Sequence, residues 1–265
     1  MTTATGNFAE LLWPGIHDIW GHAYKDYKPL YKQIFEEKKS DKRFEKEQQV
    51  TGLPLAGVKD EGNAVTFLDP DQGFQKEYSN VTYGLGAVVT REMYEDDLYG
   101  YIKSLPKMLA RSLYQTEETI HFNVLNNSFS TETSADGSAA VSGAHPLVGG
   151  GTLSNQLDTA SDLTQTSLEQ AIQDIREWTD DKGLKILVQP KMLVVQSQNL
   201  FNAKKILGTD YAVGSADNDI NPVKGIMPFI DSPYLTDEDA WWIITDQDNG
   251  LVCYDRRGAE VTPRS

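Results

Sequence analysis

The sequence has one cysteine, few basic residues and no long apolar run. The single cysteine, Cys253, has no partner for an internal disulfide, so nothing implies an oxidising compartment. The 24 Lys and Arg residues are outnumbered by 39 Asp and Glu residues, which gives a formal net charge of −15. This charge has the wrong sign for tight binding to nucleic acid.

Membrane insertion and secretion are also disfavoured. No stretch approaches the roughly 20 apolar residues that a bilayer crossing needs, and the opening MTTATGNFAELLWPG lacks the basic flank and apolar core of a secretory signal. Hydrophobic residues still make up 39% of the 265 residues, enough for one large domain or two modest ones. We therefore expect a cytosolic or assembled soluble product.

No motif for catalysis, a cofactor or a metal is complete. The four histidines are scattered, and no GxSxG elbow or P-loop occurs. Two acidic clusters, residues 217–221 and 246–250, begin like calcium loops but lack the glycine at the sixth position and the glutamate at the twelfth. We predict no catalytic, cofactor-binding or metal-binding residues. An acidic hydrolase stays as an alternative, motivated only by the abundance of carboxylates and the lone cysteine.

The strongest local pattern predicts one very long helix over residues 90–127. Thr90 is the expected N-cap, and acidic residues fill the first turns, where they meet the positive end of the helix dipole. Such a helix would span roughly 55 Å at 1.5 Å per residue, with a kink expected at Pro106. Its apolar stripe, at steps of three and four residues, comprises Leu98, Ile102, Leu105, Leu109, Leu113, Thr116, Ile120 and Val124.

Aromatic residues interleave with charges before residue 50. Tyr24, Tyr27, Tyr31 and Phe35 follow one another at three- and four-residue steps, which predicts a helix despite Pro29. An aromatic stripe of this kind either meets a partner surface or packs on its own domain. The sequence leaves both readings open.

Residues 51–83 read as an extended hairpin. Turn clusters occur at residues 60–63 and 69–73, and strands are expected over 64–68 and 74–83. The segment is charged and poor in large aliphatic residues, so we expect it to project from the body of the protein.

The remainder predicts an α+β unit. A helix is expected over residues 162–182, ending at Gly183, and a second, short helix over 197–207. The expected strands cover residues 184–188, 192–195, 226–230, 241–245 and 251–254. Strands and helices alternate without strict βαβ repeats, which favours α+β over a doubly wound sheet.

Several of these segments resemble the major capsid (major head) proteins of tailed bacteriophages, in particular the Mu-like major head subunit family. The resemblance covers nearly the whole chain. It rests on VTREMYEDD at 89–97, VLNNSF at 124–129, AHPL at 144–147 with the glycines after it, and QPKMLVV at 189–195. Relatives usually continue into a further strand, so the resemblance implies a peripheral sheet that is shortened or completed differently.

The resemblance implies the Hong Kong 97-like fold, within the α+β class. It divides the chain into an N-terminal arm (1–50), an extended loop (51–89), a peripheral domain with the spine helix (90–144), an axial domain (145–245) and a return to the peripheral domain (246–265). It also suggests inter-subunit contacts, with Lys59 or Lys76 as a possible site of a Lys–Asn crosslink. The residues expected at these contacts are Trp13, Trp20, Tyr24, Tyr27, Tyr31, Phe35, Lys59, Phe67, Phe74 and Lys76.

The implied function is structural rather than enzymatic. A capsid subunit would assemble with itself into pentamers and hexamers of an icosahedral head, in the host cytoplasm and then in the virion. Scaffold, portal and decoration proteins would be its partners, and the shell would enclose double-stranded DNA without sequence-specific binding and without a membrane. The alternative within the same fold is an encapsulin-like compartment shell.

Overall fold

The computed structural model describes residues 7–89, 96, 100–211 and 219–262, with the side chains of residues 7–14 excepted. The chain divides into two compact units. Unit 1 contains Met1–Asp41, Asn80–His121 and Cys253–Ser265, and unit 2 contains Lys42–Ser79 and Phe122–Val252. The five domain boundaries implied by the resemblance stay a prediction.

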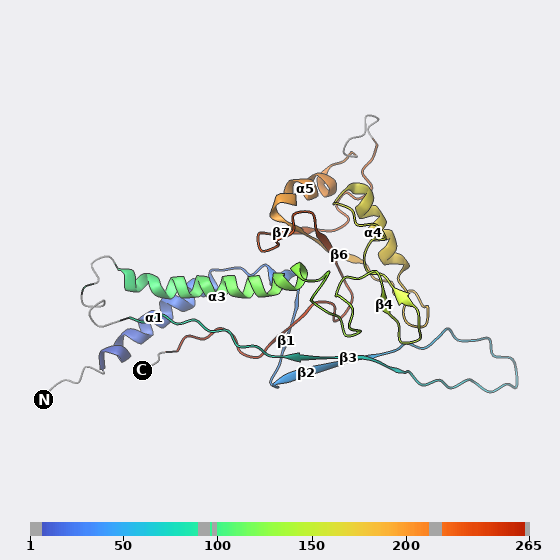
Figure 1. Cartoon of the computed structure of the whole chain (residues 1–265), viewed down its shortest axis with the longest axis horizontal. Coiled ribbons are helices and arrows are strands. Elements are labelled where there is room, and N and C mark those ends of the chain that lie inside the picture. Colours follow the sequence, from blue (N-terminus) through green and yellow to red (C-terminus); the bar gives the residue numbers. More distant parts are fainter. Residues whose placement is uncertain (1–6, 90–95, 97–99, 212–218, 263–265) are drawn as a thin grey trace. The chain divides into compact units, whose positions relative to one another are not determined.

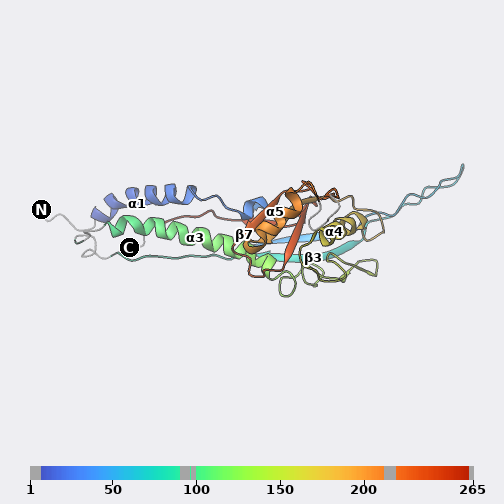
Figure 2. The same cartoon turned by 90° about the horizontal axis from the view of Figure 1, so that it is seen from above.

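In the residues that the structure describes, unit 1 contains helices α1 and α3 and a two-stranded sheet. Helix α1 (Asn7–Lys25) lies beside the first part of helix α3 (Tyr101–Asn126) in both Figure 1 and Figure 2. A short 3₁₀ turn, η1 (Tyr31–Gln33), leads into strand β1 (Glu36–Lys39), which pairs with β9 (Val252–Asp255). A segment near the start of the chain therefore pairs with a segment near its end.

The aromatic segment does not form the helix predicted over residues 24–35. Helix α1 ends at Lys25, and the chain continues through a turn, η1 and β1. Pro29 disfavours helical backbone in the residue before it and supplies no N–H, so the helix stops ahead of it. The prediction of a helix across Pro29 is wrong because this constraint outweighs the aromatic spacing.

Helix α3 is shorter than predicted. It begins at Tyr101, because Gly100 has a φ of +68°, in the left-handed region that a right-handed helix cannot include. The prediction of a continuous helix from Thr90 is therefore wrong at Gly100, and the expected cap at Thr90 lies outside the described residues. Pro106 lies within the helix, which continues on both sides of it, and the kink expected there stays a prediction.

The buried face of α3 is rotated from the predicted stripe. The buried positions are Ile102, Pro106, Ala110, Glu118, Phe122 and Leu125. Leu105, Leu109 and Ile120, from the predicted stripe, are only half-buried. The helix therefore has a buried side that includes a carboxylate, and a neighbouring apolar side that the described chain covers incompletely.

A long hairpin starts unit 2. Strand β2 (Phe44–Val50) pairs antiparallel with β3 (Gln72–Ser79), and opposite charges face each other at Glu47 and Lys76 and at Lys46 and Glu77. The nitrogen of Lys46 lies 3.2 Å from a carboxylate oxygen of Glu77. A hairpin is therefore present, but the strand predicted over residues 64–68 is wrong, since β2 comes from the charged stretch before residue 51.

The core of unit 2 surrounds a three-stranded sheet with the order β7-β6-β8. Strand β6 (Pro190–Gln196) is central, parallel to β7 (Phe229–Ser232) and antiparallel to β8 (Trp241–Thr245). Helices α4 (Gln165–Glu177) and α5 (Leu200–Gly208) pack with the sheet. The core residues are Leu163, Leu168, Ile172, Leu193, Val195, Ala203, Ile206, Leu207, Val223 and Met227.

The last residues of α3 pack into unit 2. Phe122 stacks on Tyr234 with 6.0 Å between ring centroids, and the amide of Asn126 donates to the Tyr234 carbonyl at 3.0 Å. The indole N–H of Trp242, in β8, donates to the Ser128 hydroxyl at 3.0 Å. A side-chain hydrogen bond thus fixes the turn after α3 to the sheet.

The predicted α+β class is confirmed at the level of a mixed helix-and-sheet protein. Strand β8 occupies the predicted residues, and β6, α5 and β9 overlap their predictions closely. Helix α4 ends at Glu177 instead of Lys182, and residues 184–188 contribute only an isolated bridge, from Lys185 to Thr179. Two small strands that were not predicted, β4 (His145–Pro146) and β5 (Thr152–Leu153), pair antiparallel.

Candidate assembly surfaces

The first candidate surface is the aromatic segment of unit 1, where it lies on α3. Trp20 is buried and stacks on Tyr24 with 5.2 Å between ring centroids. The Tyr24 hydroxyl is 2.7 Å from both carboxylate oxygens of Glu117 and donates its single hydrogen bond to this carboxylate. Burial, followed by this hydrogen bond and the charge of Glu117, raises the pKa of Tyr24. The hydroxyl therefore stays protonated as a donor.

Further contacts continue this line at Tyr114, one helical turn before Glu117, and at Glu118, the residue after it. Tyr27 stacks on Tyr114 with 4.6 Å between ring centroids, and the Tyr114 hydroxyl donates to the Lys28 carbonyl at 3.2 Å. The backbone N–H of Leu30 donates to a carboxylate oxygen of Glu118 at 2.6 Å. Glu118 is 0% exposed. A buried carboxylate of α3 thus holds the backbone of the N-terminal segment.

His121 ends this line of contacts. Tyr31 stacks on the imidazole with 3.8 Å between centroids, and Phe35 meets it edge-on at 5.2 Å. The Nδ1 atom of His121 is 2.6 Å from the Glu117 carbonyl, which can only accept, so Nδ1 carries the proton. The Nε2 atom lies 3.0 Å from the sulfur of Cys253, within hydrogen-bond distance.

Cys253 is a packed thiol in this arrangement. Burial, reinforced by the charges of Glu37 and Asp255, raises the pKa of the thiol. A raised pKa disfavours the thiolate that a nucleophile requires. Within the part of the chain that the structure describes, these contacts favour a packing role for Cys253 over a nucleophilic one.

The predicted contact residues of the N-terminal segment are therefore engaged within unit 1. Trp20, Tyr31 and Phe35 are buried there, and Tyr24 and Tyr27 contact α3. Trp13 lies in α1, and its side chain is outside the described part of the chain. That these residues also contact a neighbouring subunit stays a prediction.

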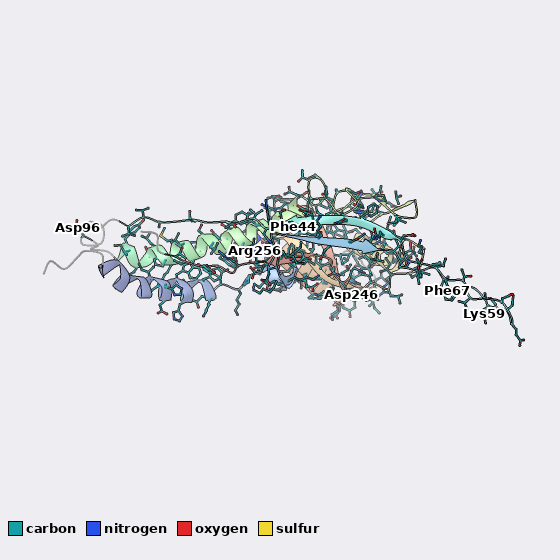
Figure 3. The ribbon with its side chains drawn as sticks, turned by 90° about the horizontal axis from the view of Figure 1, so that it is seen from below. Phe44, Lys59, Phe67, Asp96, Asp246 and Arg256 are labelled. Carbon is teal, nitrogen blue, oxygen red and sulfur yellow. The ribbon has the colours of Figure 1, made fainter. Side chains whose placement is uncertain are left out.

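The second candidate surface is the end of the β2–β3 hairpin, which extends away from the rest of unit 2 (Figures 1 and 3). We call residues 53–70 the hairpin tip. Val58 is 98% exposed and Phe67 is 92% exposed, and Lys59 lies beside them at the far end of the hairpin. The other strongly exposed apolar residues of the tip are Leu53, Leu55, Val65 and Leu68. Such a cluster of exposed apolar residues is typical of an interaction surface.

The other two predicted contact residues lie in β3, closer to the base of the hairpin. Phe74 is half-buried. The ammonium group of Lys76 donates to the Thr133 carbonyl and lies 3.7 Å from a carboxylate oxygen of Glu132. Lys76 is therefore held within unit 2, whereas Lys59 is exposed at the tip.

The metal and membrane predictions can be compared with the described residues only. Among these, no three His, Cys, Asp or Glu side chains are grouped closely enough to hold a metal ion. Part of the acidic cluster at 217–221 is outside the described residues, while Asp246 of the second cluster accepts the backbone N–H of Gln189 at 2.7 Å. No helix in the described ranges has the length and apolar character of a membrane span.

Sequence reasoning missed Glu117 and Glu118 as contact residues. Both follow Thr116, which was placed on the buried stripe, and a pair of acidic residues beside such a stripe is the signal that could have pointed to them. It also missed the turn after α4, whose contacts with the hairpin are described below.

Comparison with known proteins identifies the class. The family model for the phage capsid protein matches residues 74–264, more than two thirds of the chain. The chain therefore belongs to the phage capsid protein family, and it is a structural capsid protein of a phage virion. The resemblance to capsid proteins of tailed phages is confirmed. No curated protein sequence matches the chain.

Solved structures of bacteriophage JBD30 share the fold. The JBD30 capsid is 15% identical, with a TM-score of 0.65, and the match covers 79% of this chain and 92% of that chain. The JBD30 procapsid is also 15% identical with a TM-score of 0.65, covering 88% of this chain and 100% of that chain. The JBD30 capsid decorated with minor capsid protein trimers is 14% identical, with the same TM-score, covering 79% and 92%. These matches show a shared fold, and the family match is what favours a phage capsid over a compartment shell.

Proposed function

We propose that this chain is the major head subunit of a tailed phage, which assembles with itself into pentamers and hexamers of an icosahedral shell. The shell encloses double-stranded DNA without reading its sequence, consistent with the net charge of −15. Scaffold and portal proteins, and decoration proteins of the kind present in one JBD30 structure, are the expected partners. Assembly takes place in the host cytoplasm, and catalysis has no part in it.

The Hong Kong 97-like layout fits the two units. Residues before β2 correspond to the N-terminal arm, the β2–β3 hairpin with its tip to the extended loop, and α3 to the spine helix. The α4, α5 and β7-β6-β8 assembly corresponds to the axial domain. This assignment is supported by the capsid family match and by the shared fold of the JBD30 subunits.

The observation that carries the proposal is the exposed hairpin tip. An isolated two-stranded hairpin is at best marginally stable in water, and this one ends in apolar side chains that are strongly exposed in the chain. A partner that covered Val58 and Phe67 would remove apolar surface from water at roughly 25 cal/mol per Å². Because a capsid subunit meets copies of itself, a second copy is the expected partner.

The test is assembly of the purified chain, followed by electron microscopy and sedimentation. We expect closed particles from the native sequence. The double variant Val58→Ser with Phe67→Ser should remain unassembled, while the thermal unfolding of the monomer stays the same, because both side chains are exposed. Glu61→Gln is the matched control, since it changes the tip without removing apolar surface.

Two outcomes would contradict the proposal. If the native chain stayed monomeric under every assembly condition, the capsid role itself would fail. If the Val58 and Phe67 double variant assembled like the native chain, the tip would have no part in the contact.

A further inference from the structure

The turn after helix α4 is held by several hydrogen bonds within the turn. We call residues 179–185 the anchoring turn. One carboxylate oxygen of Asp180, Oδ1, accepts the backbone N–H groups of Lys182 at 2.9 Å and Leu184 at 2.8 Å. Gly183 takes a φ of +81°, which permits the reversal, and Thr179 bridges Lys185. The side chain of Asp180 is thus fixed in direction.

The base of the hairpin is closed just before the tip begins. Thr51 is 4% exposed, its N–H donates to the Asp71 carbonyl at 3.0 Å, and its hydroxyl accepts the Asp71 N–H at 2.9 Å. The segment leaving β2 and the segment entering β3 are therefore hydrogen-bonded to each other at Thr51 and Asp71. A contact that holds Thr51 and Asp71 in place therefore also restricts the direction in which the tip extends from the base of the hairpin.

Side chains of the anchoring turn reach that base. The ammonium group of Lys182 lies 3.1 Å from a carboxylate oxygen of Asp71. The Gln49 amide donates to Asp181 Oδ2 at 3.0 Å, and Asp181 Oδ1 accepts the Val148 N–H at 3.3 Å. Two neighbouring residues of the turn thus hold both strands of the hairpin.

Gly52 shows how closely the two segments approach. A Cβ atom placed on Gly52 would lie 2.8 Å from Oδ2 of Asp180, closer than carbon and oxygen atoms pack. The carboxylate cannot easily move aside, because its other oxygen holds two backbone N–H groups of the turn. Gly57, within the tip, has no atom within 4 Å of the same position.

We propose that the anchoring turn is the positioning element of the hairpin, with Asp180, Asp181 and Lys182 setting the direction of the tip and therefore where it meets a second copy of the chain. The consequence for the shell rests on the proposed capsid function. The consequence for the hairpin does not, because it concerns a single chain.

The first experiment uses the unassembled chain. Spin labels are attached at Phe67→Cys in the tip and Phe201→Cys in α5, both strongly exposed, with Cys253→Ser to remove the native thiol. Distance distributions are then measured by pulsed electron resonance. We expect Lys182→Met and Gly52→Ala to broaden or shift the distribution, and Gly57→Ala to leave it unchanged.

A charge exchange separates a specific ion pair from general loss of structure. Asp71→Lys with Lys182→Asp keeps the backbone hydrogen bonds of both residues and reverses the pair. We expect the exchange to restore the distribution that either single change broadens. Unchanged distributions in Lys182→Met and Gly52→Ala would overturn the proposal, as would a double exchange that is no better than the single changes.

The second experiment follows the shell. Particle diameters from cryo-electron microscopy should be uniform for the native chain and Gly57→Ala, and heterogeneous for Gly52→Ala and Lys182→Met. If the native chain formed no particles, the capsid proposal would fail while the spin-label result still decided the role of the turn. Uniform native-size particles from Gly52→Ala and Lys182→Met would show that the turn does not set the contact between copies.

Discussion

Replacing Glu118 by alanine is expected to release the N-terminal segment from α3. The Glu118 carboxylate accepts the Leu30 N–H at 2.6 Å from a position with no solvent exposure. A hydrogen bond to a charged group contributes roughly 1.5–3 kcal/mol, and an unpaired donor costs about 1–3 kcal/mol. With the cavity left by the side chain, we expect a loss of about 3 kcal/mol in the stability of this contact.

Glu118→Gln is the matched control. The amide keeps an acceptor for Leu30 and changes only the second oxygen, Oε2, which has no hydrogen-bond partner among the described residues. We therefore expect a change within about 1 kcal/mol.

Hydrogen exchange of the peptide containing Leu30 measures the difference. At tenfold per 1.4 kcal/mol, Glu118→Ala should speed exchange on the order of 100-fold, and Glu118→Gln by less than about tenfold. Equal rates in the native chain and Glu118→Ala would refute the reasoning. So would equal acceleration by both variants, because the hydrogen-bond acceptor would then be irrelevant.

Two further predictions concern the same cluster. Burial raises the pKa of Glu117 above its ordinary value of 4.5, against the opposing effects of Tyr24, His121 and Lys32, while Asp255 adds to the rise. A raised carboxyl pKa gives stability that is present below pH 4.5 and lost as the pH rises through the raised value. As the pH rises from 4.5 to neutral, the free energy of unfolding of Glu117→Gln, measured in urea, should therefore increase relative to that of the native chain. An advantage of the variant that increased on acidification would contradict this. Cys253, whose thiol pKa is raised mainly by burial, should react with iodoacetamide at pH 8 far more slowly than in urea-unfolded chain, and equal rates would exclude the packed thiol.

The central strands were predictable because their burial is encoded locally. Residues 192–195 and 241–245 are short apolar runs rich in β-branched and aromatic side chains, and both form strands of one sheet. Helix α4 also lies within the predicted range of 162–182, although it begins at Gln165, after a capping box formed by Thr164 and Ser167. Where local pattern and tertiary burial agree, the sequence was sufficient.

The errors arise where a long-range contact or a backbone constraint decides. A single glycine such as Gly100 can occur within a helix, so the sequence did not show that the helix would be interrupted there. The positive φ of Gly100 prevents the helix from continuing through it. The charged stretch before Val50 pairs as a strand because Lys46 and Glu47 face Glu77 and Lys76 some thirty residues on. Nothing local in 44–50 carries that information.

The candidate surfaces divide in the same way. That the hairpin would project followed from its charge and turn signals, and Lys59 and Phe67 are indeed exposed. That Tyr24, Tyr31 and Phe35 would lie on Glu117 and His121 did not follow, because the partners are about 90 residues away. The spacing of the aromatic residues indicates that their side chains pack against another surface, but it does not indicate which part of the chain provides that surface.

The two surfaces contribute differently: the aromatic residues of unit 1 stabilise the single subunit, whereas the hairpin tip is available for contact with another subunit. In unit 1 the aromatic residues are covered by the chain's own helix, so their burial contributes to the stability of a single subunit. The tip has no such cover, and ordering its backbone costs about 1–2 kcal/mol for each residue fixed. In the proposed shell this entropy cost is incurred at assembly, when a second copy covers apolar side chains such as Val58 and Phe67. The anchored base of the hairpin restricts the directions available to the tip beforehand, so less entropy remains to be lost when it meets a neighbour.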